Sequence, residues 1–197
     1  MPPKILSFIV ITLLYGCASD LQPKPESFPS GGPVAFGRIE VSLTGPTNRW
    51  YGPAVEFVEV RNRETDQRFR IELQAKRSLF VVSLPAGEYE LARVQIGEGP
   101  FRGIGYISSA FRIGATDQAT YLGTWKFSVS SPFYYRIVAL NVTSELTETV
   151  AEMSVAYPDH RLPPVVSALP SPGKDENRLF EMWAYPRVKY FRRHQGL

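Results

Sequence analysis

The sequence predicts a mainly β domain: an antiparallel β-sandwich with one amphipathic helix towards its C-terminal side and an irregular tail. The first observation is that apolar and polar residues alternate over short runs from Val34 onward, which is typical of strands with one solvated face. The second is that turn-forming residues separate these runs, with 15 glycines and 17 prolines in 197 residues. The third is a hydrophobic fraction of 44%, with 13% aromatic residues, which suits one packed core.

The strands are expected where the alternation has period two. Residues 68–74 show it most clearly, with Phe69, Ile71 and Leu73 on one face. A polar connection joins this run to the apolar run before it, so the two predict a hairpin with one solvated face. Strands are expected over residues 34–43, 54–60, 68–74, 78–84, 88–96, 104–113, 119–129 and 134–142.

One hairpin is encoded locally by Leu84-Pro85-Ala86-Gly87-Glu88-Tyr89-Glu90-Leu91. Pro85 presets φ for a turn, and Gly87 can take a positive φ. The alternation slips after Tyr89, so we expect a β-bulge near Leu91–Ala92. The stretch resembles the Leu-Pro-x-Gly-x-Tyr-x-Leu hairpin of transthyretin-like sandwiches, including carboxypeptidase regulatory-like domains. The resemblance implies the fold and no activity, because functions within that superfamily differ widely.

A single helix is expected after the last of these strands. Ser144 has the character of an N-cap, and acidic residues follow it at the positive end of the helix dipole. Pro158 ends the segment. One apolar stripe is formed by Leu146, Val150, Met153 and Tyr157. We therefore expect this helix to pack on a face or an edge of the sheet.

The N-terminus reads as a targeting segment. Lys4 supplies a positive charge, and the apolar run 5–14 is too short to span a bilayer, which takes about 20 helical residues. Leu14-Tyr15-Gly16-Cys17 follows, with the one cysteine of the chain, and resembles the lipobox of bacterial lipoproteins. An ordinary secretory signal with an incidental cysteine is the alternative.

The lipobox resemblance implies that residues 1–16 are a signal peptide and that Cys17 is acylated, with palmitate-type chains, and becomes the new N-terminus. Two or more acyl chains give stable membrane attachment. Ala18 at the following position resembles the class sorted to the outer membrane, where the domain faces the periplasm. Residues 17–33 then serve as the lipidated cysteine and a flexible tether, rich in Pro, Ser and Gly.

The charge of the chain is concentrated in its tail. The formal net charge is +3, so strong nucleic-acid binding by the whole protein is not indicated, and we expect no nucleic-acid partner. Residues 161–197 form a Pro-rich linker and a C-terminal arm that is basic and aromatic together. Partner-binding residues are predicted there: Phe180, Trp183, Tyr185, Arg187, Tyr190, Phe191, Arg192 and Arg193.

Three explanations are open for this arm, because exposed aromatic rings are costly in water. It packs on its own sandwich as an added edge strand or short helix, it docks on a partner protein, or it lies on an anionic membrane surface.

Motifs for catalysis are weak. His160 and His194 both follow the predicted domain, where no nucleophile is placed beside them. No His, Cys or acidic cluster has metal-ligand spacing, and no metal or cofactor is expected. The aromatic residues Trp50-Tyr51 and Phe133-Tyr134-Tyr135 fall at strand ends, where rings stack on sugars or grip a partner.

The sequence therefore predicts a non-catalytic, lipid-anchored protein of the bacterial outer membrane that acts as an interaction or assembly component of the envelope. Its partners would be the membrane, through Cys17, and an envelope protein. The alternative is a lipoprotein module that binds a small molecule or glycan through Trp50 and Tyr51. The expected organisation is signal peptide 1–16, tether 17–33, sandwich and helix 34–160, and linker with arm 161–197.

Overall fold

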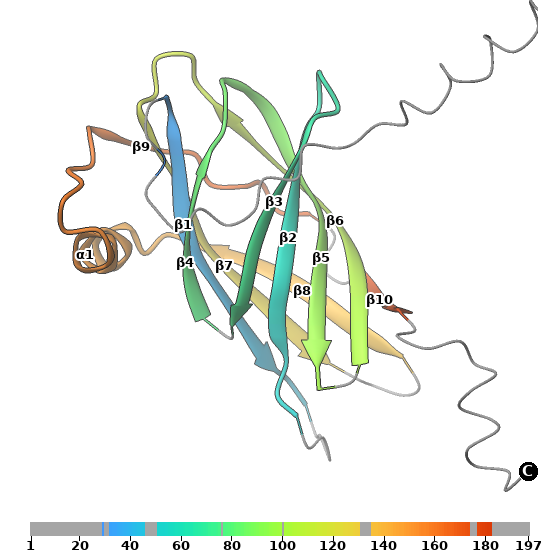
Figure 1. Cartoon of the computed structure of the whole chain (residues 1–197). Coiled ribbons are helices and arrows are strands. Elements are labelled where there is room, and N and C mark those ends of the chain that lie inside the picture. Colours follow the sequence, from blue (N-terminus) through green and yellow to red (C-terminus); the bar gives the residue numbers. More distant parts are fainter. Residues whose placement is uncertain are drawn as a thin grey trace, which may run out of the picture.

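The computed structural model describes residues 29, 32–45, 51–75, 77–99, 101–130, 135–173 and 177–182 (Figure 1). The predicted signal peptide, Cys17 and Trp50 lie outside the described residues, as do residues 183–197 and most of the tether. Within the described part, the chain forms ten strands and one helix, so the mainly β class is confirmed.

Each of the eight strands expected from the alternation is present. The elements are β1 (Val34–Leu43), β2 (Ala54–Asn62), β3 (Arg68–Ala75), β4 (Arg77–Ser83), β5 (Gly87–Glu98), β6 (Phe101–Ile113), β7 (Ala119–Ser130), β8 (Arg136–Thr143), α1 (Leu146–Ala156), β9 (Val165–Ser167) and β10 (Asn177–Met182).

The strands belong to one sheet with the order β3-β2-β5-β6-β10-β8-β7-β1-β4, and β9 pairs with β7 off this path. The two end strands, β3 and β4, follow one another in the chain and lie side by side, so the sheet curls into a nearly closed, barrel-like shape (Figure 1).

The predicted antiparallel sandwich is not confirmed. One continuous sheet takes the place of two packed sheets, and it is mixed, because β1 pairs with β7 and β7 with β9 in parallel. Alternation shows which side chains share a face, but it does not show which strand is the neighbour. The likeness to transthyretin-like domains stays a prediction.

The interior of the sheet is filled by large side chains. Trp125 is fully buried, and its ring lies 4.5 Å from that of Phe80, measured between centroids. Tyr89, from the predicted hairpin, stacks on Phe111 at 5.6 Å, and its hydroxyl donates to the Pro85 carbonyl at 2.7 Å. Burial raises the pKa of the Tyr89 phenol. The expected bulge is confirmed by a register shift between Leu91 and Arg93.

Helix α1 packs on the outer side of the sheet, over β1, β4 and β7 (Figure 1). Phe36 and Tyr121 meet the buried Met153 there, and the predicted apolar stripe is confirmed as part of this second core. The predicted cap is wrong. Glu145, rather than Ser144, is the N-cap, and its side chain forms no capping bond, because the carboxylate is held by cations on the sheet.

The predicted irregular tail is wrong over two segments. Residues 165–167 form β9, and residues 177–182 form β10, which lies between β6 and β8 in the sheet. Leu179 pairs with Gly105 on one side and Arg136 on the other, and its side chain is buried in the core. A Cβ atom at Gly105 would lie 2.6 Å from Val138 Cγ1 and 3.2 Å from Leu179 Cδ2. The glycine therefore leaves the room that these two side chains fill.

Of the three explanations for the arm, packing on its own domain is the one that residues 177–182 adopt. The segment is inside the strand order and not at its edge. Its two adjacent apolar residues, Leu179 and Phe180, break the alternation of polar and apolar residues that would predict a strand beside a Pro-rich stretch.

Candidate functional site

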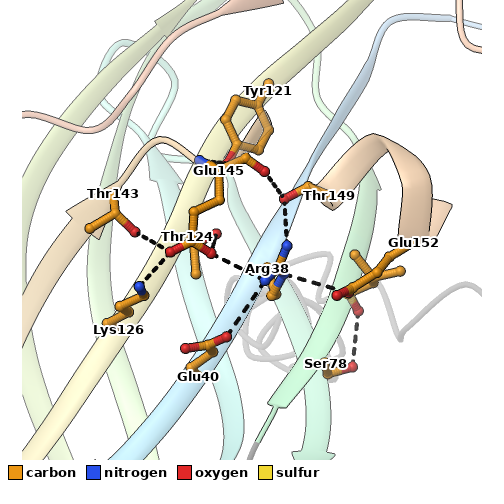
Figure 2. A network of polar contacts seen from close by, with 11 residues as sticks. Arg38, Glu40, Ser78, Tyr121, Thr124, Lys126, Thr143, Glu145, Thr149 and Glu152 are labelled. Carbon is orange, nitrogen blue, oxygen red and sulfur yellow. Dashed lines mark hydrogen bonds and ion pairs between the residues drawn. The ribbon is translucent and has the colours of Figure 1, made fainter. Parts of the chain in front are cut away.

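Two groups of polar and aromatic side chains stand out among the described residues. We call the first the Arg38 network. It consists of Arg38, Glu40, Tyr121, Thr124, Lys126, Thr143, Glu145, Thr149 and Glu152 (Figure 2). We call the second the β10 surface. It consists of Phe101, Arg102, Tyr106, Tyr135, Arg136, Arg178 and Phe180.

Arg38 lies beneath helix α1 and is 3% exposed. Its Nη1 donates to Glu145 Oε2 at 3.1 Å, and its Nη2 donates to Thr149 Oγ1 at 3.2 Å. Ion pairs join its Nε to Glu152 Oε2 at 3.5 Å and its Nη1 to Glu40 Oε1 at 3.7 Å. Figure 2 shows the guanidinium between the sheet and the helix, facing carboxylates from both.

Glu145 is the second centre of the Arg38 network. Lys126 Nζ donates to its Oε1, while the hydroxyls of Thr124 and Thr143 donate at 3.2 and 3.1 Å. The Glu145 backbone N–H donates to the Tyr121 hydroxyl oxygen at 2.8 Å. These bonds, chiefly the one from Lys126, hold the pKa of Glu145 below its ordinary value.

The Arg38 network connects β1, β7 and α1 and contains two cations and three carboxylates. The buried arginine already faces three carboxylates. A buried charge needs such partners to offset the loss of water. The arrangement therefore fastens the helix to the sheet, and it leaves little capacity for a ligand.

A smaller ion cluster joins three neighbouring strands, β2, β3 and β5. The Glu59 side chain is 1% exposed and pairs with Arg93 at 2.6 Å and Arg68 at 3.3 Å. The Arg70 guanidinium lies 3.9 Å from the centroid of the Phe57 ring. These arginines cover an otherwise apolar outer patch.

The β10 surface differs because its rings face solvent. Tyr106 on β6 is 59% exposed and Phe180 on β10 is 55% exposed, and their ring centroids are 6.0 Å apart in an edge-to-face arrangement. Phe101 and Tyr135, at 47% and 39%, lie at the ends of β6 and β8 next to it. Exposed aromatic rings that cluster on a solvent-facing surface are characteristic of sites that contact other molecules.

Three arginines lie among these rings. Arg102 Nε donates to both oxygens of Glu56, at 2.9 and 3.1 Å, and Arg136 Nε donates to Glu98 at 3.1 Å. Arg178 is exposed and lies 5.3 Å from the centroid of the Tyr135 ring. Within the described part of the chain it forms no ion pair. Among the described residues, its guanidinium is thus the one cation of this surface without a carboxylate partner.

An open pocket of about 140 Å³ lies between these groups. Arg102 and Gly103 of β6, Tyr135 and Arg136 at the start of β8, and Arg178 and Phe180 of β10 line it. Its lining thus combines two aromatic rings, those of Tyr135 and Phe180, with three arginines.

The structure brings one of the predicted arm residues, Phe180, into this surface. Seven others lie outside the described residues: Trp183, Tyr185, Arg187, Tyr190, Phe191, Arg192 and Arg193. Tyr51, the described member of the predicted Trp50-Tyr51 pair, is 58% exposed, and its ring packs on Gly99. It lies with the β5–β6 turn and not in the β10 surface.

Tyr106 and Arg178 were missed as site residues by reasoning from the sequence. The signal for Tyr106 was present, because the alternation of 104–113 places this aromatic ring on the solvated face, in phase with Arg112. No comparable signal pointed to Arg178, since only the pairing of β10 with β6 and β8 brings it beside Tyr135.

His160 lies just beyond helix α1 and lines a separate pocket with Met153 and Tyr157. No group of three His, Cys, Asp or Glu side chains in the described ranges is arranged to hold a metal ion.

No family model, curated protein or solved structure matches this chain significantly. Among the residues that the structure describes, no helix is both long and apolar enough to cross a membrane.

Proposed function

We propose that this chain is a non-catalytic, lipid-anchored component of the bacterial envelope that binds a partner protein through the β10 surface and the arm that follows it. The observation that carries the proposal is the exposed pair Tyr106 and Phe180, set beside the exposed Arg178, whose guanidinium lies over the Tyr135 ring. Tyrosine, other aromatic residues and arginine are the side chains that contribute most to binding at protein interfaces.

The backbone beneath these side chains is well suited to binding. Leu179 is buried between β6 and β8, so Arg178 and Phe180 project from a strand that is paired on both sides. A rigid strand has little conformational freedom left to lose when a partner binds. The last residue of β10, Met182, pairs with Arg102 of the same surface, and the arm follows it in the sequence.

Attachment through Cys17 is the second part of the proposal. The lipobox-like Leu14-Tyr15-Gly16-Cys17 supports it. Mass spectrometry of detergent-extracted protein should find a chain that begins at Cys17 and carries acyl groups, and Cys17→Ser should release an unacylated chain. A wild-type chain that keeps residues 1–16, or that begins elsewhere without lipid, would contradict anchoring.

The interaction is tested by quantitative pull-down from envelope extracts with the full-length chain. The double variant Tyr106→Ser/Phe180→Ser should lose the partner that the wild type retains. Val155→Ser is the matched control, because Val155 is an 84% exposed apolar side chain on α1, away from this surface. Equal retention by both variants would contradict the proposed docking surface.

A glycan or small polar ligand is the second candidate function. A pocket of about 400 Å³ next to the loop of Tyr51 is lined by Glu56, Arg70, Glu72 and Arg102, and charged groups of both signs suit a polar ligand. A glycan that occupies it should raise the melting temperature of the wild type and not of Glu72→Gln. No shift across a glycan panel would count against this candidate.

A further inference from the structure

We propose that the pocket of the β10 surface receives a carboxylate from an acidic, aromatic-containing segment of the partner protein, with Arg178 as the residue that binds it. This inference rests on the proposed function and names the chemistry of the partner.

The state of Arg178 is the first argument. In the described part of the chain every other arginine of the β10 surface has a carboxylate partner: Arg102 has Glu56 and Arg136 has Glu98. Arg178 has only the face of the Tyr135 ring. Stacking on a ring orients a guanidinium and leaves its N–H edge open, and that edge matches the two oxygens of a carboxylate.

The shape of the pocket is the second argument. Its volume of about 140 Å³ is enough for one small side-chain group and too small for a folded element. Phe180 forms one wall, and beyond it Tyr106 is exposed in edge contact. A segment with an acidic residue in the pocket would therefore place its neighbouring side chains over two exposed rings, where an aromatic residue gains most.

The charge of the arm beyond Met182 argues against it as the occupant. That arm carries Arg187, Lys189, Arg192 and Arg193 and no acidic residue, so it would bring positive charge to a cationic pocket. That arrangement is repulsive, whereas an acidic partner segment is complementary.

The test is a selection of phage-displayed random peptides on the full-length chain held in detergent micelles, followed by affinity measurement of the selected peptides. The wild type should enrich peptides that combine Asp or Glu with an aromatic residue. Arg178→Gln should weaken their binding by about tenfold or more, the expected loss for one charge-assisted hydrogen-bonded pair. Arg112→Gln is the matched control, because Arg112 is exposed at the far end of β6 from Arg102 and should change binding little.

The outcomes separate this inference from the proposed function. Peptides that depend on Phe180 but contain no acidic residue would overturn the carboxylate inference and leave the docking surface in place. Equal weakening by Arg178→Gln and Arg112→Gln would also overturn it, because the effect would then be one of net charge alone.

A further binding experiment uses dihexanoyl phosphatidylglycerol, a soluble anionic lipid. If this lipid binds through Arg178 and no acidic peptide is enriched, the pocket serves membrane headgroups and the inference is wrong. If no peptide is enriched and the pull-down is also empty, both proposals are wrong.

Discussion

Arg38 and Arg178 both project from the outer side of the same sheet, but their surroundings are opposite. Arg38 is 3% exposed and faces Glu40, Glu145 and Glu152. Arg178 is exposed, rests on an aromatic ring and has no carboxylate partner among the described residues. The first arginine has its carboxylate partners within the fold, whereas for the second we propose a carboxylate partner on another molecule.

The aromatic residues show the same contrast. Phe36 and Tyr121 beside the Arg38 network are covered by helix α1, which brings its own apolar stripe to them. Tyr106 and Phe180 have no such cover and remain more than half exposed. Helix α1 thus covers one part of the outer side of the sheet. We place the partner on another part, the β10 surface.

The largest expected effect comes from Arg38→Leu. Removal of the guanidinium takes the buried cation from Glu145 and Glu152, whose side chains are partly exposed. Hydrogen bonds to charged groups contribute about 1.5–3 kcal/mol. The free energy of unfolding, measured by urea titration, should fall by that amount. Arg61→Leu is the control, because Arg61 pairs with Glu90 from a 39% exposed side chain and such pairs contribute about 0–1 kcal/mol. Similar losses in both variants would contradict the claim that the Arg38 network stabilises the fold more than an exposed ion pair does.

A smaller effect is expected from acid. The pKa of Glu145 is lowered in the folded state, chiefly by its hydrogen bond from Lys126. A carboxylate with a depressed pKa adds stability above its ordinary value of 4.5 and loses it as the pH falls through the folded-state value. The stability gap between wild type and Glu145→Gln should therefore narrow as the pH falls below 4.5. Urea titrations at several pH values would check this, and a gap that stays constant would contradict the role of Glu145.

The smallest effect on stability is expected in the β10 surface. Tyr106→Ser and Phe180→Ser each remove a ring that is more than half exposed, so the free energy of unfolding should change by about 0.5 kcal/mol or less. Urea titration of each variant checks this. A loss of several kcal/mol would mean that these rings hold the fold together, and their exposure would no longer point to a partner.

Much of the fold was predictable because alternation is a local signal. It located the eight strands from β1 to β8, the helix stripe and the bulge after Leu91. It did not predict the parallel pairing of β1 with β7, since pairing joins segments far apart in the chain. Nor did it predict β9 and β10, whose short runs become strands only where neighbouring strands offer them a place.

The candidate site was predictable only in part, for the same reason. The aromatic and basic character of the arm pointed to Phe180. The neighbours that make Phe180 part of a surface, Tyr106 and Tyr135, lie on β6 and at the start of β8 and meet it through the sheet. Likewise, the sequence holds no sign that Arg38 would find its carboxylates on a helix more than a hundred residues later.

The central claim is that the chain meets its partner at the β10 surface and not over helix α1. The most direct measurement is site-specific photocrosslinking in intact cells, with a photoreactive phenylalanine analogue placed at Tyr106 or at Val155. The account predicts one protein crosslinked from position 106, lost when Arg178→Gln is added, and none from position 155. The same crosslink from both positions, or a crosslink from position 155 alone, would contradict it.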